Sequence, residues 1–375
     1  MIFREYIFTM VSSSHPQLPV KTCTPQAMQS GRRGRLSVAG PSTQPQETIT
    51  NSPSISGDLR LLHTIDCGDQ PLCCQFNNDG TRVAVGLRTG AIKVYSVNDG
   101  SLHHILADND TISLGLPTTS LHFMPRGPAH SGDVLLTTYS GGKVKLWHVS
   151  THTCLYTITE DRQTLAACFN PSGSRFLTAG AGPGIFMYDA QTWDKLQNFL
   201  PSDSPNVMDG HMSRIYALTF FPENNERFIS GGWDDTVQFW DTRFPHSQRR
   251  ISGPHICGDA LSIDKTGTQI LTGSWRRHNT LQIWDAETCG KIMDIPEDFR
   301  GHSQLYTCHF LGTDYIIAGG SRNNLCRLID RRILMSTGAL NDLPGGVYST
   351  HISYRGVLAA TSNNFLYLAQ TPVKP

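Results

Sequence analysis

Residues Gly210 to Arg243 read GHMSRIYALTFFPENNERFISGGWDDTVQFWDTR, and they form the clearest copy of a unit that the chain repeats. Apolar and polar residues alternate in three short runs, which is the pattern of strands with one buried face. Turn-forming residues separate these runs, first at Pro222 to Asn225 and then at Gly231 to Asp235. This segment therefore predicts three antiparallel strands joined by tight turns.

The end of this unit, two apolar residues followed in most copies by a polar one, recurs seven times along the chain. The central residues of the seven copies are Tyr95, Trp147, Tyr188, Trp240, Trp284, Ile329 and Tyr367. Their spacing lies near the length of about 40 to 45 residues that one propeller blade takes, with two longer intervals explained by polar insertions. The recurrence predicts an all-β repeat architecture with seven units.

The unit resembles the WD-repeat family, in which Gly-His near the start and Trp-Asp near the end enclose one four-stranded blade. Here these pairs are Gly210-His211 and Trp240-Asp241. The resemblance implies a seven-bladed β-propeller. It also implies that four side chains form a buried hydrogen-bonded tetrad in the fourth repeat, namely His211, Ser230, Asp234 and Trp240. The other repeats lack part of this set, so we expect apolar packing between sheets to hold them.

The chain ends predict how such a ring closes. Residues 1 to 57 are rich in Ser, Pro, Gln and Thr and lack hydrophobic periodicity, so we interpret them as a disordered tail ahead of a propeller at residues 58 to 370. The run 59 to 65 is strand-like, and the seventh unit lacks a fourth strand. We expect residues 59 to 65 to complete that last blade. Deletion through Thr64 should then destabilise the protein, whereas deletion of residues 1 to 50 should not.

A basic cluster in the tail offers one candidate modification site. Three arginines precede Ser37, a pattern that suits a basophilic kinase and weakly resembles a nuclear address. The alternative is a solvated basic patch, which is the commoner meaning of such a cluster.

No catalytic or metal-binding constellation is visible in the sequence. The Ser, His and Asp of the fourth repeat have the spacing of the blade tetrad, so we do not interpret them as a catalytic triad. The ten cysteines include no C-x-x-C pair. We therefore predict no enzymatic activity, no metal and no cofactor.

One face of the expected propeller carries the candidate partner site. In the family, the residue before the tetrad aspartate and the first residue of the inner strand face binding partners. The matching and neighbouring positions here are Arg214, Trp233, Trp275, Arg276, Arg277 and Arg322. Trp and Arg are enriched at binding hot spots, and the arginines suit an acidic or phosphorylated peptide. For the tryptophans, an alternative is a lid packed over the neighbouring blade.

A second motif leaves another function open. Trp240-Asp241-Thr242-Arg243 resembles the W-D-x-R box by which WD-repeat substrate receptors dock on an adaptor of cullin–RING ubiquitin ligases. The resemblance implies that Trp240, Asp241 and Arg243 form the adaptor contact, on the face opposite the partner site. The alternative is an Arg that follows Trp-Asp without any adaptor contact.

The composition narrows the class of partner. Basic and acidic residues number 31 each, so no charged field favours nucleic acid, and no apolar run is long enough to span a membrane. We expect a cytoplasmic scaffold that binds proteins or peptide motifs, with the nucleus as a second compartment and a ubiquitin-ligase substrate receptor as the alternative function.

Overall fold

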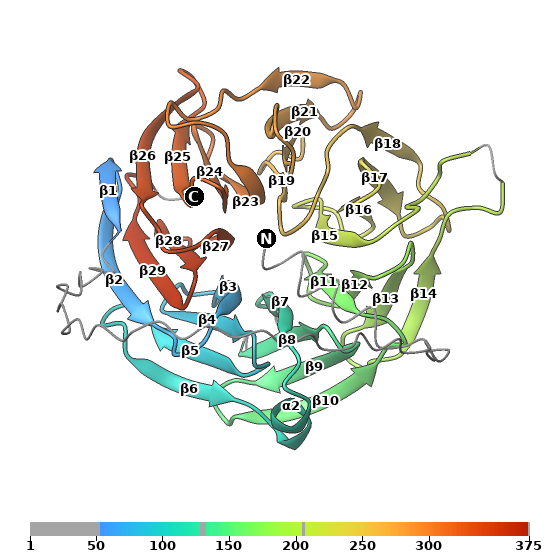
Figure 1. Cartoon of the computed structure of the whole chain (residues 1–375). Coiled ribbons are helices and arrows are strands. Elements are labelled where there is room, and N and C mark those ends of the chain that lie inside the picture. The colour runs from blue at the N-terminus through green and yellow to red at the C-terminus, as the bar shows by residue number, and fades with distance from the viewer. Residues whose placement is uncertain (1–52, 128–132, 205–206, 374–375) are drawn as a thin grey trace, which may run out of the picture. The chain divides into compact units, whose positions relative to one another are not determined.

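The predicted β architecture is confirmed. The computed structural model describes residues 53–127, 133–204 and 207–373, and in these residues the chain forms 29 strands and one short helix. The strands make seven antiparallel sheets, six of four strands and one of five. In Figure 1 the seven sheets stand around a common centre like the blades of a propeller.

Each blade is built mainly from four consecutive strands, numbered from the inside outwards. Blade 1 contains β3 (Pro71–Phe76), β4 (Arg82–Leu87), β5 (Ile92–Ser96) and β6 (Leu102–Leu106). Blade 2 contains β7 (Thr118–Phe123), β8 (Val134–Tyr139), β9 (Lys143–His148) and β10 (Thr153–Thr159). Blade 3 contains β11 (Thr164–Phe169), β12 (Arg175–Gly180), β13 (Ile185–Asp189) and β14 (Lys195–Phe199). Blade 4 contains β15 (Ile215–Phe220), β16 (Arg227–Gly232), β17 (Thr236–Asp241) and β18 (Arg249–Ser252).

The remaining blades complete the ring. Blade 5 contains β19 (Leu261–Ile263), β20 (Gln269–Gly273), β21 (Leu281–Asp285) and β22 (Lys291–Asp294). Blade 6 contains β23 (Gln304–Leu311), β24 (Tyr315–Ser321), β25 (Cys326–Asp330), β26 (Met335–Asn341) and, outside them, β1 (Ser54–Gly57). Blade 7 contains β27 (Val347–Ile352), β28 (Val357–Ser362), β29 (Phe365–Gln370) and β2 (Arg60–Asp66). All seven recurring residues of the sequence pattern lie in the third strand of a blade.

The N-terminal strand closes the ring as predicted. Strand β2 pairs antiparallel with β29, and the register runs from Arg60 opposite Gln370 to Asp66 opposite Phe365. Blade 7 thus takes its outer strand from one end of the described chain and its inner three strands from the other. This pairing removes the exposed edge that β29 would otherwise present.

A second strand, β1, extends this closure to blade 6. It pairs with β26, so the segment of residues 54–66 fastens two neighbouring blades. Between the two strands the chain turns at Gly57, whose φ is +67° and where a Cβ would stand 1.7 Å from the carbonyl oxygen of Thr337. Only glycine fits there. Leu59 follows and is 5% exposed, packed in the apolar cluster that contains Leu328 and Tyr367 of blades 6 and 7.

One detail of the sequence interpretation is corrected, and another is extended. The boundary of the tail at residue 57 is wrong, because residues 54–57 form β1 on an edge supplied by β26. One of the two polar insertions follows Asp108 and contains a helix, α2 (Asn109–Leu114), which begins where the Asp108 carboxylate accepts a hydrogen bond from the Thr111 amide. The rest of the predicted tail, with Ser37, lies outside the described residues.

The core lies between the sheets. Buried apolar clusters each combine residues of two neighbouring blades, as where Leu177 of blade 3 joins Phe228 and Trp240 of blade 4. The alternation read in the sequence explains this, because successive side chains point to opposite faces of a sheet and both faces of each blade are covered. Burial of this apolar surface is the main stabilising contribution, about 25 cal/mol for each Å².

Three histidines lie on the innermost strands, where the sheets approach each other. His351 of β27 accepts a hydrogen bond from the Phe76 amide at 3.3 Å, and its ring centroid lies 6.3 Å from that of His309. Burial, with the positive charges that His309 and His122 would carry, lowers the pKa of His351 to about 3. This imidazole is therefore neutral in the folded protein at neutral pH.

Leu59→Ala should weaken the closure of the ring. The substitution removes a buried side chain between blades 6 and 7, and we expect the free energy of unfolding to fall by about 2–4 kcal/mol. Chemical denaturation of the purified chain measures this. Ile55→Ala in β1 is the control, since Ile55 is 36% exposed and should cost less than about 1 kcal/mol. Equal losses in both variants would contradict the proposed role of Leu59.

Acid should destabilise the fold through His351. A histidine whose pKa is lower in the folded state than in the unfolded chain stabilises the fold above about pH 6.5, and this contribution disappears as the pH falls towards the folded pKa. The free energy of unfolding should therefore decrease between pH 6.5 and 4.5. His351→Gln should show a shallower decrease over this range, and an unchanged slope would exclude the effect.

Candidate functional site

The four residues predicted to form a tetrad are brought together in blade 4. The His211 Nδ1 lies 2.9 Å from the Asp234 Oδ2, and the His211 Nε2 lies 2.7 Å from the Ser230 Oγ. The Trp240 Nε1 donates to the same Ser230 Oγ at 2.7 Å. The chain of hydrogen bonds thus connects the loop before β15 with strands β16 and β17, and every polar group in it has a partner.

The tetrad is a structural element and not a reactive one. His211 and Ser230 are completely buried, so no substrate reaches the Ser230 hydroxyl. Burial acts to raise the pKa of Asp234, but the hydrogen bond and charge of His211, with further donors from Met212 and Thr236, hold that pKa below its usual range. The carboxylate is ionised at neutral pH and locks the loop in place.

Blade 3 contains a polar network that the sequence analysis missed. Glu160, buried in the loop between blades 2 and 3, accepts hydrogen bonds from the Tyr188 hydroxyl at 2.9 Å and the Thr178 hydroxyl at 2.5 Å. Arg162 donates to the same carboxylate at 2.9 Å. Tyr188 and Thr178 occupy the places of Trp240 and Ser230, so a glutamate here replaces the histidine of the tetrad. Apolar packing is not the only contact that holds this blade.

The predicted partner site lies on one face of the ring, which we call the upper face. It consists of the turns between the second and third strands of each blade and the loops that enter the inner strands. Trp233 lies there, half-buried, with its ring 5.7 Å from that of Tyr216 and 5.7 Å from that of His255 in the loop of blade 5. The Arg214 guanidinium lies 5.8 Å from the same ring. Trp233 therefore packs over the neighbouring blade and still exposes part of its surface.

An aromatic band continues from Trp233 along the upper face. The half-buried Trp275 stands in the corresponding turn of blade 5, beside Tyr306 of blade 6. The ring of Tyr306 lies 5.5 Å from that of Tyr348 in blade 7, and burial raises the pKa of both hydroxyls. We use the name upper aromatic band for Tyr216, Trp233, His255, Trp275, Tyr306 and Tyr348.

The three tyrosines of this band share one backbone position. A β-bulge interrupts the inner-strand register between Ile215 and Ala217, and the same occurs around Tyr306 and Tyr348. The bulged residue has no opposite partner and is turned away from the regular side-chain alternation. The sequence signal was an apolar residue followed by Tyr at the same place in repeats four, six and seven, which the analysis of the repeats did not use.

Basic side chains border the band. Arg277 and Arg322 are exposed, and the half-buried Arg276 donates to Gln282 at 3.1 Å. Arg322 donates to Gln304 at 3.0 Å. None of these three arginines, nor Arg214, forms an ion pair with a carboxylate among the described residues. Their charges remain available to an acidic group from another molecule.

Arg243 lies on the opposite face, in the turn after the third strand of blade 4. Its Nε donates to the Asp241 Oδ1 at 2.8 Å and its NH2 to the Asp241 Oδ2 at 2.5 Å. The side chain is 69% exposed, and Asp241 raises the pKa of the guanidinium. Asp241, in the same motif, therefore already binds Arg243, which is the side chain that would have to contact the adaptor. Trp240 is buried in the tetrad and offers no surface.

No group of three or more His, Cys, Asp or Glu side chains among residues 53–127, 133–204 and 207–373 has an arrangement that could hold a metal ion. In the same residues there is no helix with the length and apolarity needed to cross a bilayer.

Comparisons with known proteins agree with this geometry. A model of the WD domain, G-beta repeat, matches residues 203–241, which include the tetrad. The human WD repeat-containing protein 18 is 26% identical over 187 residues, or 48% of this chain and 42% of that protein. Human pre-mRNA-processing factor 17 is 25% identical over 180 residues, or 45% of this chain and 27% of that protein. The U3 small nucleolar RNA-associated protein 12 of Saccharomyces cerevisiae is 27% identical over 113 residues, or 30% of this chain and 11% of that protein.

The matched regions cover less than half of the length of each of these three relatives. What such larger proteins do as a whole is therefore not transferred by the similarity.

Ser230→Ala should destabilise blade 4. It leaves the buried Trp240 Nε1 and the His211 Nε2 without their partner, which costs about 2–3 kcal/mol. Ser252→Ala, at an exposed position of the same sheet, should change the free energy of unfolding by less than about 0.5 kcal/mol. Urea denaturation of both variants measures the difference, and a loss in Ser230→Ala no larger than in the control would show that the tetrad does not stabilise the blade.

Proposed function

Because the chain is a WD-repeat β-propeller protein, we propose that it is a non-catalytic scaffold that binds protein partners through its upper face. The upper aromatic band carries this proposal. Its aromatic side chains lie over blades 4 to 7, and Trp233 and Trp275 keep part of their surface exposed. Large aromatic side chains beside arginine give binding energy and direction, as at the hot spots of protein interfaces.

The charges of this face favour an acidic partner segment. Arg276, Arg277 and Arg322 stand in neighbouring turns of blades 5 and 6, and their guanidinium groups are free of carboxylates in the described residues. A carboxylate or phosphate group can form paired hydrogen bonds with such groups. The partner that we propose is therefore a peptide segment with acidic or phosphorylated residues next to an apolar one.

We place this scaffold in the nucleus as well as the cytoplasm. The support is the names of two relatives, which refer to a small nucleolar RNA and to pre-mRNA processing. The formal net charge of zero does not favour direct binding to nucleic acid, so the proposed contact in such an assembly is with a protein component.

The receptor function suggested by Arg243 remains the second proposal. Its support is the exposure of that side chain at the end of the W-D-x-R motif. The Asp241 carboxylate competes for the guanidinium, and the relatives named above carry no reference to a ubiquitin ligase in their names. The scaffold function is favoured for these reasons.

The double variant Trp233→Ala and Trp275→Ala should lose the partners of the upper face. We expect at least a tenfold decrease of the main co-purifying proteins when tagged chains are isolated from cells and quantified by mass spectrometry. Since Trp233 also packs on His255, the melting temperature should fall by only a few degrees. The control is Tyr354→Ala, an exposed aromatic residue in a turn of the opposite face.

The outcomes of this experiment distinguish the scaffold function from the receptor function. Unchanged capture by the double variant would exclude the upper face as the binding site. Arg243→Ala in the same experiment should leave the captured proteins unchanged, and selective loss of a ubiquitin-ligase adaptor would instead support the receptor function.

A further inference from the structure

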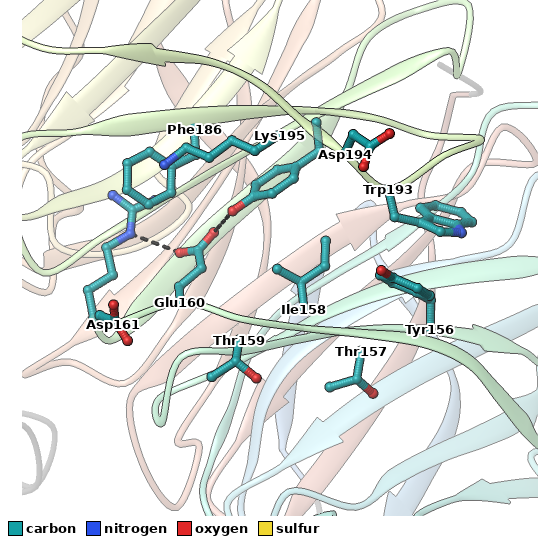
Figure 2. Close-up of a pocket in the computed structure, with 12 residues that line it drawn as sticks. Tyr156, Thr157, Ile158, Thr159, Glu160, Asp161, Phe186, Trp193, Asp194 and Lys195 are labelled. Atoms are coloured by element: carbon teal, nitrogen blue, oxygen red, sulfur yellow. Dashed lines mark hydrogen bonds and ion pairs between the residues drawn. The ribbon is translucent and has the colours of Figure 1, made fainter.

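A groove separates the outer part of blade 2 from blade 3, outside the four blades that carry the upper aromatic band. Its volume is about 570 Å³, and one wall is formed by residues 156–162, which include the end of the outer strand β10. The other wall consists of Phe186, Tyr188 and residues 193–195, from strands β13 and β14 and the turn between them. Figure 2 shows Tyr156 beside Trp193 and Glu160 directed towards blade 3, whereas Thr157 and Thr159 point to the other side of the strand. We call this the blade 2–3 groove.

The charges at the base of the groove cancel. Glu160 is 1% exposed, and its carboxylate accepts hydrogen bonds from Arg162, Thr164, Thr178 and Tyr188. Arg162 also donates to backbone carbonyl oxygens of blade 3. The Glu160 carboxylate has no acceptor capacity left, and Arg162 uses most of its donors within the fold, so both groups mainly hold the groove in shape.

Aromatic rings line the rest. Tyr156 of blade 2 is 44% exposed and stacks on Trp193 of blade 3, with ring centroids 5.8 Å apart and planes at 23°. Deeper in the groove the Phe186 ring is in contact with two cations, since the Lys195 Nζ lies 3.2 Å from its centroid and the Arg162 Cζ lies 3.7 Å away. The groove therefore already places positive charge against an aromatic face, which is a favourable contact.

The rim carries an excess of negative charge. Asp161 and Asp194 are exposed, and in the described residues neither carboxylate has a hydrogen bond or an ion pair. Lys195 is the single cation of the lining that Glu160 does not pair with. Within the lining, two free carboxylates stand against one ammonium, a formal charge of minus one, while the Lys143 ammonium beside the lining donates to the Thr159 hydroxyl at 2.9 Å. A cation from another molecule complements this rim, whereas an anion would face two unpaired carboxylates.

The wall from blade 2 also offers backbone partners. Strand β10 pairs with β9 on one side only, so its other edge is free in the sheet. Its sequence, TCLYTIT, contains no proline, and extended segments of other proteins add to such edges by main-chain hydrogen bonds. The occupant that fits both the edge and the rim is an extended peptide with a basic side chain.

We propose that the blade 2–3 groove binds an extended, arginine-containing peptide segment of a partner protein. Its backbone lies along β10, and the arginine stacks on the exposed face of the Tyr156–Trp193 pair with its charge towards Asp194. The planar guanidinium suits this position because it stacks on a ring and still donates hydrogen bonds at its edge. This site is separate from the upper face and does not depend on the function proposed for that face.

Binding of two labelled peptide pools tests the proposal. Both have the form acetyl-Xaa-Val-Zaa-Val-Xaa, where Xaa is an equal mixture of Val, Thr, Ile and Leu, and Zaa is arginine in one pool and glutamate in the other. Fluorescence anisotropy with the full chain should show binding of the arginine pool at least tenfold tighter than that of the glutamate pool. No binding of the arginine pool, equal binding of both, or preference for glutamate would overturn the proposal.

Variants locate the site. Asp194→Asn and Trp193→Ala should each weaken binding of the arginine pool at least fivefold. Trp193 has a φ of +66° and its ring lies 6.4 Å from that of Phe176, so Tyr156→Thr, at an exposed strand position, serves as a second variant if Trp193→Ala does not fold. Tyr354→Ala, an exposed aromatic residue outside both sites, is the matched control and should bind as wild type. Unchanged binding in Asp194→Asn and Tyr156→Thr would overturn the assignment to this groove.

Discussion

The pairing of β2 with β29 is the constraint on which the rest of the structure depends. Each blade buries both faces against its neighbours, so a blade at an open end would expose one apolar face and one strand edge. Closure of the ring covers both the apolar face and the strand edge. The structure secures this junction twice, by hydrogen bonds of β2 to blade 7 and of β1 to blade 6, with Leu59 packed between them. The arrangement of surface residues over blades 4 to 7 exists only because the circle is complete.

The sequence predicted the structural features that recur in every repeat and missed the features that occur in one repeat only. The Trp and Tyr residues of the third strands recur because each must fill the same space between sheets, so their spacing determined the number of blades. The tetrad could be predicted from the sequence because its four residues keep the family's spacing around Trp240. Strand β1, in contrast, has only four residues, Ser-Ile-Ser-Gly, with a single apolar side chain, and it is a strand only because β26 offers an edge. Propensity carries no information about such an edge.

The site residues divide in the same way. Trp233 and Arg214 could be placed because the family pattern fixes their turn. The tyrosines of the upper aromatic band needed the inner-strand bulges, which depend on backbone geometry and leave only a weak trace in the residue order. Glu160 is missed for another reason: it lies in a loop before the blade that it serves, and nothing in its neighbours indicates that Tyr188 and Thr178 will meet it.

Two binding surfaces on separate blades would allow one scaffold to hold two proteins at once.

The strand order also affects how the protein folds during its synthesis on the ribosome. Strand β2 is made first, and its partner β29 lies about 300 residues later in the chain. At about 5–20 residues per second, the early strand waits roughly 15–60 s before its partner has been translated. During this interval the nascent chain contains an unpaired strand and an incomplete set of sheets. Molecular chaperones bind partly folded chains of this kind. Each molecule therefore passes through an open, unsealed form once before it reaches its working shape.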